Sequence, residues 1–117
     1  MTLDRRLIDQ MVADVGPEAF GRLAALFQEE TWQSIEDITH LAAAPAEKTD
    51  WRELGRRAHS LKHAATSFGL VGLAAVAFRI EQAADAGDKA VVENRTASLK
   101  AVAEMELGVF GDVIKPS

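Results

Sequence analysis

The chain contains no cysteine, so it can form neither a disulfide framework nor a thiolate metal site. It also has no G-x-x-x-x-G-K-[ST] loop and no kinase glycine loop, so nothing in it marks an ATP site. Basic residues are outnumbered: 13 lysines and arginines against 18 aspartates and glutamates give a net charge of −5. A nucleic-acid backbone needs a concentration of basic residues, so we expect no nucleic acid among the partners and favour a protein partner.

Long apolar runs are missing as well. No stretch approaches the roughly 20 uninterrupted apolar residues of a membrane-spanning helix. The N-terminal stretch MTLDRRLIDQMV mixes charges with apolar residues and lacks the continuous apolar centre of a signal peptide. We therefore expect a cytoplasmic protein that does not enter a membrane.

The composition is that of an ordinary globular domain, with 48% hydrophobic and 26% charged residues. A length of 117 residues supports one buried core but not two, so 1–117 is expected to form a single domain. Strands find no support, because there is no Asn-Gly hairpin turn and no sustained alternation of apolar and polar residues. Apolar residues recur instead at helical spacing.

The first half of the chain predicts two helices. A short one is expected over about 4–14, ending before a Gly-Pro pair. A long one begins at Pro17, a favoured first helical position, and runs to about Ala44, because Pro45 follows. Its predicted apolar stripe consists of Phe20, Leu23, Phe27, Ile35, Ile38 and Leu41.

Three more helices are predicted in the second half. Asp50 can cap the third, with Glu53 reaching back to it, and Gly69 can close this helix near residue 68. The fourth spans about 71–86 and ends at Gly87, and Asp88 can cap a fifth that runs to about residue 110. Four long amphipathic helices with short loops predict an all-α fold, an antiparallel four-helix bundle with a short extra N-terminal helix.

The third helix carries the stretch RRAHSLKHAATSFG, residues 56–69, with two histidines and a lysine. At about 100° per residue, His59 lies nearly opposite the predicted core face and should be reachable from solvent, with Arg52, Gly55, Lys62 and His63 around it. That core face consists of Leu54, Ala58, Leu61, Ala65 and Phe68.

A reachable imidazole beside an ammonium group suits phosphoryl transfer. A neutral imidazole nitrogen is nucleophilic, and phosphoryl transfer asks the protein mainly for positioning and charge neutralisation. Lys62, three residues beyond His59, can place its charge beside the transferred group. The other ring nitrogen needs an acceptor from a neighbouring helix, for which Glu81 is the first candidate and Gln82 the alternative.

The stretch AHSLKHAATSFG resembles the phosphorylation motif of histidine-containing phosphotransfer (HPt) domains of bacterial two-component phosphorelays. That motif has an Ala-His-x-Leu-Lys-Gly core followed by small residues and a glycine. The later stretch LAAVAFRIEQAADAG, residues 73–87, resembles the family's next helix, and the expected bundle is the family's architecture. The residues that match the motif are Ala58, His59, Leu61, Lys62, Ala64, Ala65, Ser67, Phe68 and Gly69.

The resemblance implies a role for each site residue. His59 is the phosphorylated residue, Lys62 the electrostatic helper and Glu81 the hydrogen-bond partner of the imidazole. The phosphoryl group comes from a receiver-domain aspartate, as in a hybrid histidine kinase, and passes to the receiver of a response regulator. The carrier has no cofactor of its own, because the Mg²⁺ belongs to the partner receiver, and it has no autonomous ATP-dependent kinase activity. We expect a monomer.

His63 departs from the family pattern, which most often has glycine directly after the lysine. Its side chain must swing aside, contact the phosphoryl group or the receiver, or restrict which receivers fit. Arg56, on the His59 side, is a candidate rim contact for an acidic receiver cleft. An apolar docking patch nearby could include Leu7, Met11 and parts of the second helix, for a small and transient interface.

Two alternatives stay open from the residues. His59 and His63, at i and i+4, could bind a divalent metal with Glu81 as third ligand, although Lys62 between them opposes a cation and no H-E-x-x-H motif is present. A helical adaptor that binds a partner without accepting phosphate would also fit the fold, with His63 as the sign of lost transfer.

Overall fold

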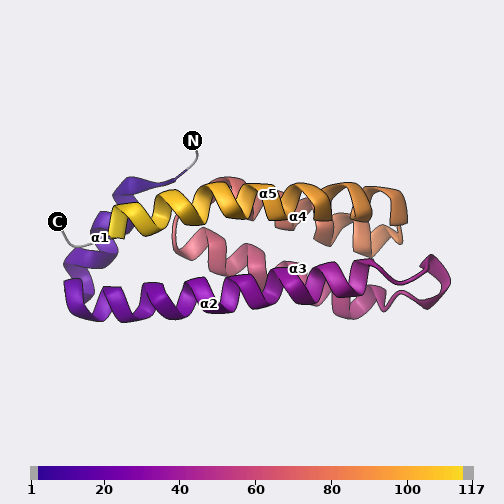
Figure 1. Ribbon diagram of the computed structural model, residues 1–117, viewed down its shortest axis with the longest axis horizontal. Coiled ribbons are helices and arrows are strands. Elements are labelled where there is room, and N and C mark those ends of the chain that lie inside the picture. Colours follow the sequence, from indigo (N-terminus) through magenta and orange to yellow (C-terminus); the bar gives the residue numbers. More distant parts are fainter. Residues whose placement is uncertain (1–2, 115–117) are drawn as a thin grey trace.

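The computed structural model describes residues 3–114 and folds them into five α-helices and one short 3₁₀ helix. Four long helices run antiparallel and form a bundle, and the short first helix lies at one end of it (Figure 1). The all-α four-helix bundle with an extra N-terminal helix is thus confirmed. The elements are α1 (Arg5–Val15), α2 (Pro17–Ala42), η1 (Ala46–Lys48), α3 (Trp51–Ser67), α4 (Val71–Ala86) and α5 (Lys89–Ile114).

Aspartate side chains begin three of the helices. Asp4, Asp50 and Asp88 each accept a hydrogen bond from the backbone N–H three residues later, at 3.2, 3.0 and 3.2 Å. Each bond satisfies a donor that the first helical turn leaves without a partner. The reciprocal bond expected from Glu53 gives way to a stronger pairing, because its carboxylate binds arginine side chains of α3.

The helix ends agree with the sequence to within a few residues. Gly87 adopts the left-handed conformation, with φ 64°, and closes α4 as expected. The second helix ends at Ala42, two residues earlier than predicted, and α5 continues past Phe110 to Ile114. The extra turn of α5 forms because Val113 and Ile114 pack against the core.

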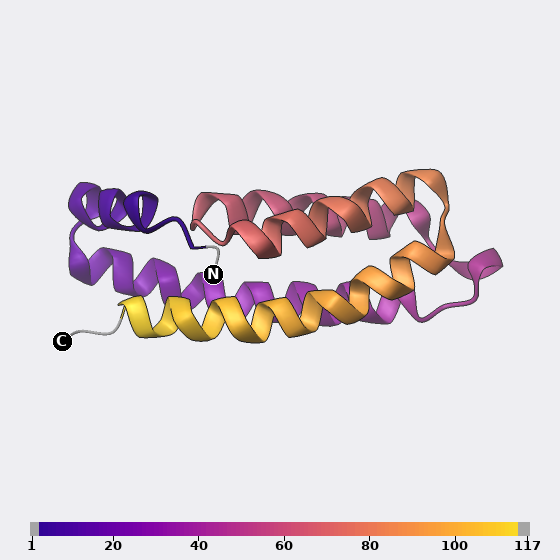
Figure 2. The same cartoon turned by 90° about the horizontal axis from the view of Figure 1, so that it is seen from above.

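The bundle is longer on one side than on the other. Both α2 and α5 have 26 residues, or about 39 Å of helix at 1.5 Å per residue, whereas α3 and α4 have 17 and 16. The space beyond the shorter pair is taken by α1, which continues their layer (Figure 2). The start of α1 is tied to the α3–α4 turn, since the Asp4 N–H donates to the Gly69 carbonyl at 2.8 Å.

The core follows one seam along each helix. On α2 the buried positions are 20, 24, 27, 31, 35, 38 and 42, so successive buried residues are three or four apart, as on one face of an α-helix. Leu23 lies outside this seam and is 48% exposed, so its predicted place in the core is wrong and Ala24 fills the position. Phe68 is only partly buried, but its ring stacks on Phe27 with centroids 4.2 Å apart.

One buried carboxylate joins α5 to α4. Glu106 has no exposed surface, and its two oxygens accept from the backbone N–H groups of Gly72 and Leu73 at 3.1 and 2.8 Å. These donors belong to the first turn of α4, where the helix dipole also favours a negative charge. Glu106 therefore fixes the start of the helix that carries Glu81.

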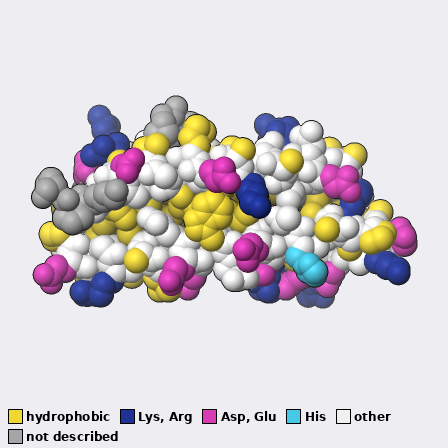
Figure 3. Space-filling view, in the orientation of Figure 1, with side chains coloured by type: hydrophobic (Ala, Val, Ile, Leu, Met, Phe, Trp, Pro, Cys, Tyr) yellow, Lys and Arg dark blue, Asp and Glu magenta, His cyan; other side chains and the backbone are white. Residues whose placement is uncertain are grey.

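The face built by α2 and α5 shows apolar side chains that reach the surface between the two helices (Figure 3). Trp32 of α2 and Val102 of α5 are partly buried and pack against the core. Among residues 3–114, no helix is both long enough and apolar enough to cross a membrane.

Candidate functional site

Helices α3 and α4 lie behind α2 and α5 in the view of Figure 1 and pack closely on each other. Small side chains permit this approach: Gly55, Ala58, Ala77 and Ala84 are all buried. A Cβ atom at Gly55 would lie 3.7 Å from the Ala84 Cβ, in van der Waals contact. Gly55 had been expected on the solvent side with His59, and it is buried because it faces α4 rather than solvent.

His59 and Glu81 meet across this contact. His59 Nδ1 lies 2.6 Å from Glu81 Oε2, and the side chains are 49% and 19% exposed, respectively. The imidazole is therefore held by α4 on one side and open to solvent on the other. Gln82 is exposed and lies about 100° further round α4, so the structure brings Glu81 rather than Gln82 to His59.

Lys62 binds the other oxygen of the same carboxylate. Its Nζ donates to Glu81 Oε1 at 3.1 Å, and the Lys62 side chain is 25% exposed. The ammonium group also lies 5.0 Å from the centroid of the Phe78 ring, within cation–π range. Glu81 and Phe78, three residues apart on α4, thus hold the lysine beside His59.

The pKa of Glu81 results from opposed effects. Partial burial raises this pKa, whereas the hydrogen bonds from Lys62 and His59 and their charges lower it, and the net result is a pKa below the ordinary value of 4.5. Glu81 is therefore an ionised carboxylate at neutral pH, able to accept hydrogen bonds but not to donate them.

His63 lies on the other side of the His59 ring. Its Nε2 is 3.0 Å from His59 Nε2, and the two rings meet edge to face with centroids 4.4 Å apart. A continuous row of contacts therefore runs from Lys62 through Glu81 and His59 to His63. Both imidazoles are exposed, so neither ring is required to fill the core.

Comparison with known proteins identifies the family to which this chain belongs. The Hpt domain family model matches residues 22–107, which include the whole of α3 and α4. The chain belongs to the Hpt domain family. Hpt domains transfer phosphoryl groups in phosphorelays and interact with receiver domains, and this general role applies to the chain.

A solved structure shares the fold of this Hpt domain. It is that of a candidate histidine-containing phosphotransfer protein from rice, with a TM-score of 0.62 and 18% sequence identity over 97% of this chain and 85% of the rice chain. At that identity the likeness concerns the fold alone. A comparison with curated proteins found no match.

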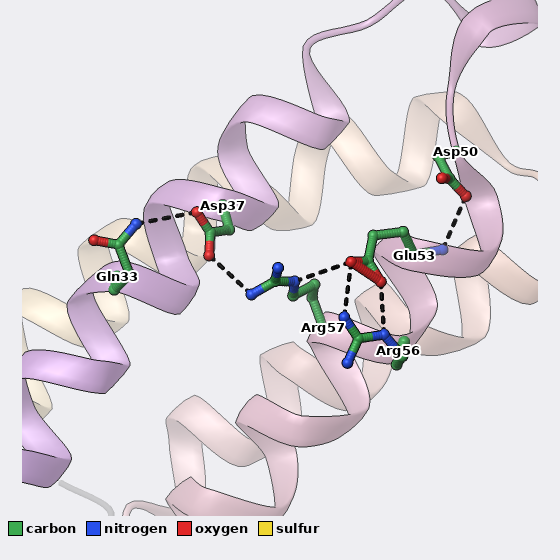
Figure 4. A network of polar contacts seen from close by, with 6 residues as sticks. All are labelled: Gln33, Asp37, Asp50, Glu53, Arg56 and Arg57. Atoms are coloured by element: carbon green, nitrogen blue, oxygen red, sulfur yellow. Dashed lines mark hydrogen bonds and ion pairs between the residues drawn. The ribbon is translucent and has the colours of Figure 1, made fainter.

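Arg56 of this Hpt domain belongs to a network of charges next to the site (Figure 4). Its guanidinium binds both oxygens of Glu53, at 2.6 and 2.7 Å, and this pairing raises the pKa of Arg56 and lowers that of Glu53. Arg57 bridges Glu53 to Asp37 of α2. Arg56 is 63% exposed, so its charge is accessible although it is already paired.

The geometry argues against the metal alternative. Glu81 and His63 contact different nitrogens of the His59 ring, which point in different directions, so the three side chains cannot bind one ion in this arrangement. In the part of the chain that the structure describes, no group of three His, Asp or Glu side chains is placed to hold a metal.

The apolar residues proposed for a docking patch lie on α1. Leu7 and Met11 are partly buried there, and Met11 packs against the core. Sequence reasoning missed Phe78, which is 43% exposed and contacts Lys62. Its spacing of three residues from Glu81 was the available signal, because residues three apart share a helix face.

Proposed function

We propose that this Hpt domain is a phosphorelay carrier that accepts a phosphoryl group on Nε2 of His59. The observation that carries the proposal is the 2.6 Å contact between His59 Nδ1 and the ionised carboxylate of Glu81 on a half-exposed ring. A carboxylate can only accept, so Nδ1 holds the proton and the lone pair lies on Nε2. Nε2 is then the nucleophilic atom.

The charges around His59 suit the transfer step. The Nε2 lone pair attacks phosphorus of an aspartyl phosphate, the P–O bond to the aspartate breaks, and its electron pair leaves on the aspartate carboxylate. Nδ1 keeps its proton, so the imidazole ring becomes cationic, and Glu81 stabilises that charge. Lys62, on the same face of α3, supplies positive charge for the phosphoryl oxygens.

The proposed partners are two receiver domains, one of a hybrid histidine kinase and one of a response regulator, which meet this domain as a monomer in the cytoplasm. The receiver brings the aspartate and the Mg²⁺, so the carrier needs no cofactor and no ATP site of its own. Phe78 offers an exposed apolar contact beside Lys62, and Arg56 offers a charge at the rim. Such contacts suit a small, transient interface.

A phosphotransfer assay tests the proposal. Phosphorylated receiver domains with Mg²⁺ are mixed with wild type, His59→Gln and His40→Gln, and label on the carrier is followed. His40 is the matched control, because it is an exposed histidine of α2 in the last turn of that helix, away from the α3–α4 contact. We expect acid-labile label on wild type and His40→Gln and none on His59→Gln.

Other outcomes have definite meanings. Label that persists in His59→Gln would place the phosphoryl group elsewhere and reject the assignment of the site. Absence of label on wild type with every receiver tried would favour the alternative, a helical adaptor that binds a signalling partner without accepting phosphate. A stable receiver complex without label would support that adaptor.

A further inference from the structure

His63 contacts the atom that the proposed reaction uses. The 3.0 Å separation joins His63 Nε2 to His59 Nε2, not to the nitrogen that faces Glu81. The edge-to-face arrangement of the rings, at 72°, points one ring nitrogen toward the other rather than stacking the two faces. The side chain at this position is therefore engaged with the nucleophile in the unphosphorylated protein.

The direction of the hydrogen bond follows from Glu81. The Glu81 carboxylate accepts a hydrogen bond from Nδ1 of His59, so Nδ1 carries the proton. Neutral His59 then has no proton on Nε2 and can only accept a hydrogen bond there. Two protonated nitrogens would repel each other at 3.0 Å, and two bare nitrogens would have no hydrogen to share. With His59 neutral, the proton between the rings therefore comes from His63.

We propose that His63 is a proton-donating cap on the nucleophilic nitrogen of His59, and that it transfers its hydrogen bond to a phosphoryl oxygen once His59 is phosphorylated. This inference rests on the proposed function and assigns His63 a role in it. In the free protein the cap occupies the Nε2 lone pair, so it must swing away before the phosphorus can approach. His63 is exposed, which leaves its ring free to rotate outward.

The cap gains a new acceptor after transfer. The lone pair that accepted from His63 now forms the N–P bond, and the phosphoryl oxygens project into the space beside His63 Nε2. Its N–H can donate to one of them while Lys62, three residues along α3, neutralises another. Hydrogen bonds of this charged type typically change an equilibrium or a rate by about tenfold, so we expect slower loss of the phosphoryl group by that factor.

Three variants separate the proton from the bulk of His63. His63→Ala removes both, His63→Phe keeps a ring without a donor, and His63→Gln keeps an N–H donor. Each is labelled from a phosphorylated receiver and freed of the receiver, and the decay of the label is then followed. We expect decay about tenfold faster than wild type for the Ala and Phe variants, and near wild type for the Gln variant. The His63→Ala variant should also accept label several-fold faster than wild type, because no side chain then covers the Nε2 lone pair of His59.

A second measurement needs no phosphoryl group. In ¹⁵N-labelled wild type, a scalar coupling between the Nε2 atoms of His59 and His63 reports the hydrogen bond directly. The ¹⁵N resonances of the His59 ring report which nitrogen carries the proton, and Glu81→Gln, whose side chain is neutral, is the variant with which they are compared. Resonances of His59 with the proton on Nδ1 and a detectable coupling support the cap. A proton on Nε2 of His59, or no coupling, overturns it.

The results also separate this inference from the proposed function. Wild type that is labelled on His59 while all three variants decay at the wild-type rate would overturn the cap and leave the carrier role intact. Faster decay in His63→Ala but not in His63→Phe would show that bulk protects the group, which also overturns the donated proton. If wild type accepts no label, both the proposed carrier function and the role of His63 as a cap are overturned.

Discussion

Replacement of Glu81 by glutamine tests whether charge on this side chain drives phosphorylation of His59. Glu81→Gln keeps the shape and one acceptor oxygen but removes the negative charge that faces the ring 2.6 Å away. Two opposite charges about 4 Å apart attract by about 4 kcal/mol at an effective dielectric constant of 20. His59 is 49% exposed, so water screens this attraction, and we take about 1.5 kcal/mol, the lower value for a charged hydrogen bond.

That energy corresponds to about a tenfold change in rate. We expect Glu81→Gln to accept label from a phosphorylated receiver about tenfold more slowly than wild type, in single-turnover assays with excess receiver. Gln82→Ala is the matched control, because Gln82 is the adjacent exposed residue of α4, and its rate should equal that of wild type. A Glu81→Gln rate within about twofold of wild type, or a larger loss in Gln82→Ala, would refute the reasoning.

Three further predictions concern stability, each measured as the free energy of unfolding in urea. Gly69→Ala should destabilise the fold by about 2 kcal/mol, because Gly69 has φ 80° and a Cβ there would meet backbone 3.0 Å away. As the control, Gly21→Ala on the open surface of α2 should stabilise the fold slightly. Equal effects of the two substitutions would contradict this prediction. Glu106→Ala should cost about 3 kcal/mol, because the N–H groups of Gly72 and Leu73, one part-buried and one buried, both lose their acceptor; Glu106→Gln keeps one acceptor oxygen and should cost less. Because the pKa of Glu81 is lowered in the folded protein, ionised Glu81 contributes stability at pH values above the ordinary carboxyl pKa. As pH falls below 4.5, wild type should therefore lose more free energy of unfolding than Glu81→Gln does. Parallel plots of unfolding free energy against pH for the two proteins would contradict this prediction.

Much of the fold could be predicted because the signals are local. An aspartate before a helical stretch caps it wherever it occurs, and a glycine such as Gly87 can close a helix without reference to distant residues. The error at Leu23 arose where periodicity alone leaves a choice. Leu23 and Ala24 are adjacent, and only the packing of neighbouring helices decided that the smaller residue faces the core.

The site was less predictable, because it depends on the rotation of α4 against α3. The sequence offered both Glu81 and Gln82 as partners for His59, and the close contact at Gly55 selects the orientation that presents Glu81. The contact between His63 and His59 could not be foreseen, since helical spacing gives proximity but not the direction of a side chain. Phe78 was missed for a similar reason: its spacing of three residues from Glu81 places it on the same helix face but does not reveal its contact with Lys62.

The charges of the site suggest why the row of contacts extends to His63. Before transfer, the Glu81 carboxylate balances the Lys62 ammonium, and the neutral His59 adds nothing. After transfer, the phosphoryl group brings a double negative charge and the ring a single positive one, so the site has an excess of one negative charge. A donor from His63 lies where that excess develops, and a protonated imidazole there would cancel it. A glycine at this position could offer neither, so His63 should favour the phosphorylated state of this carrier over the unphosphorylated one.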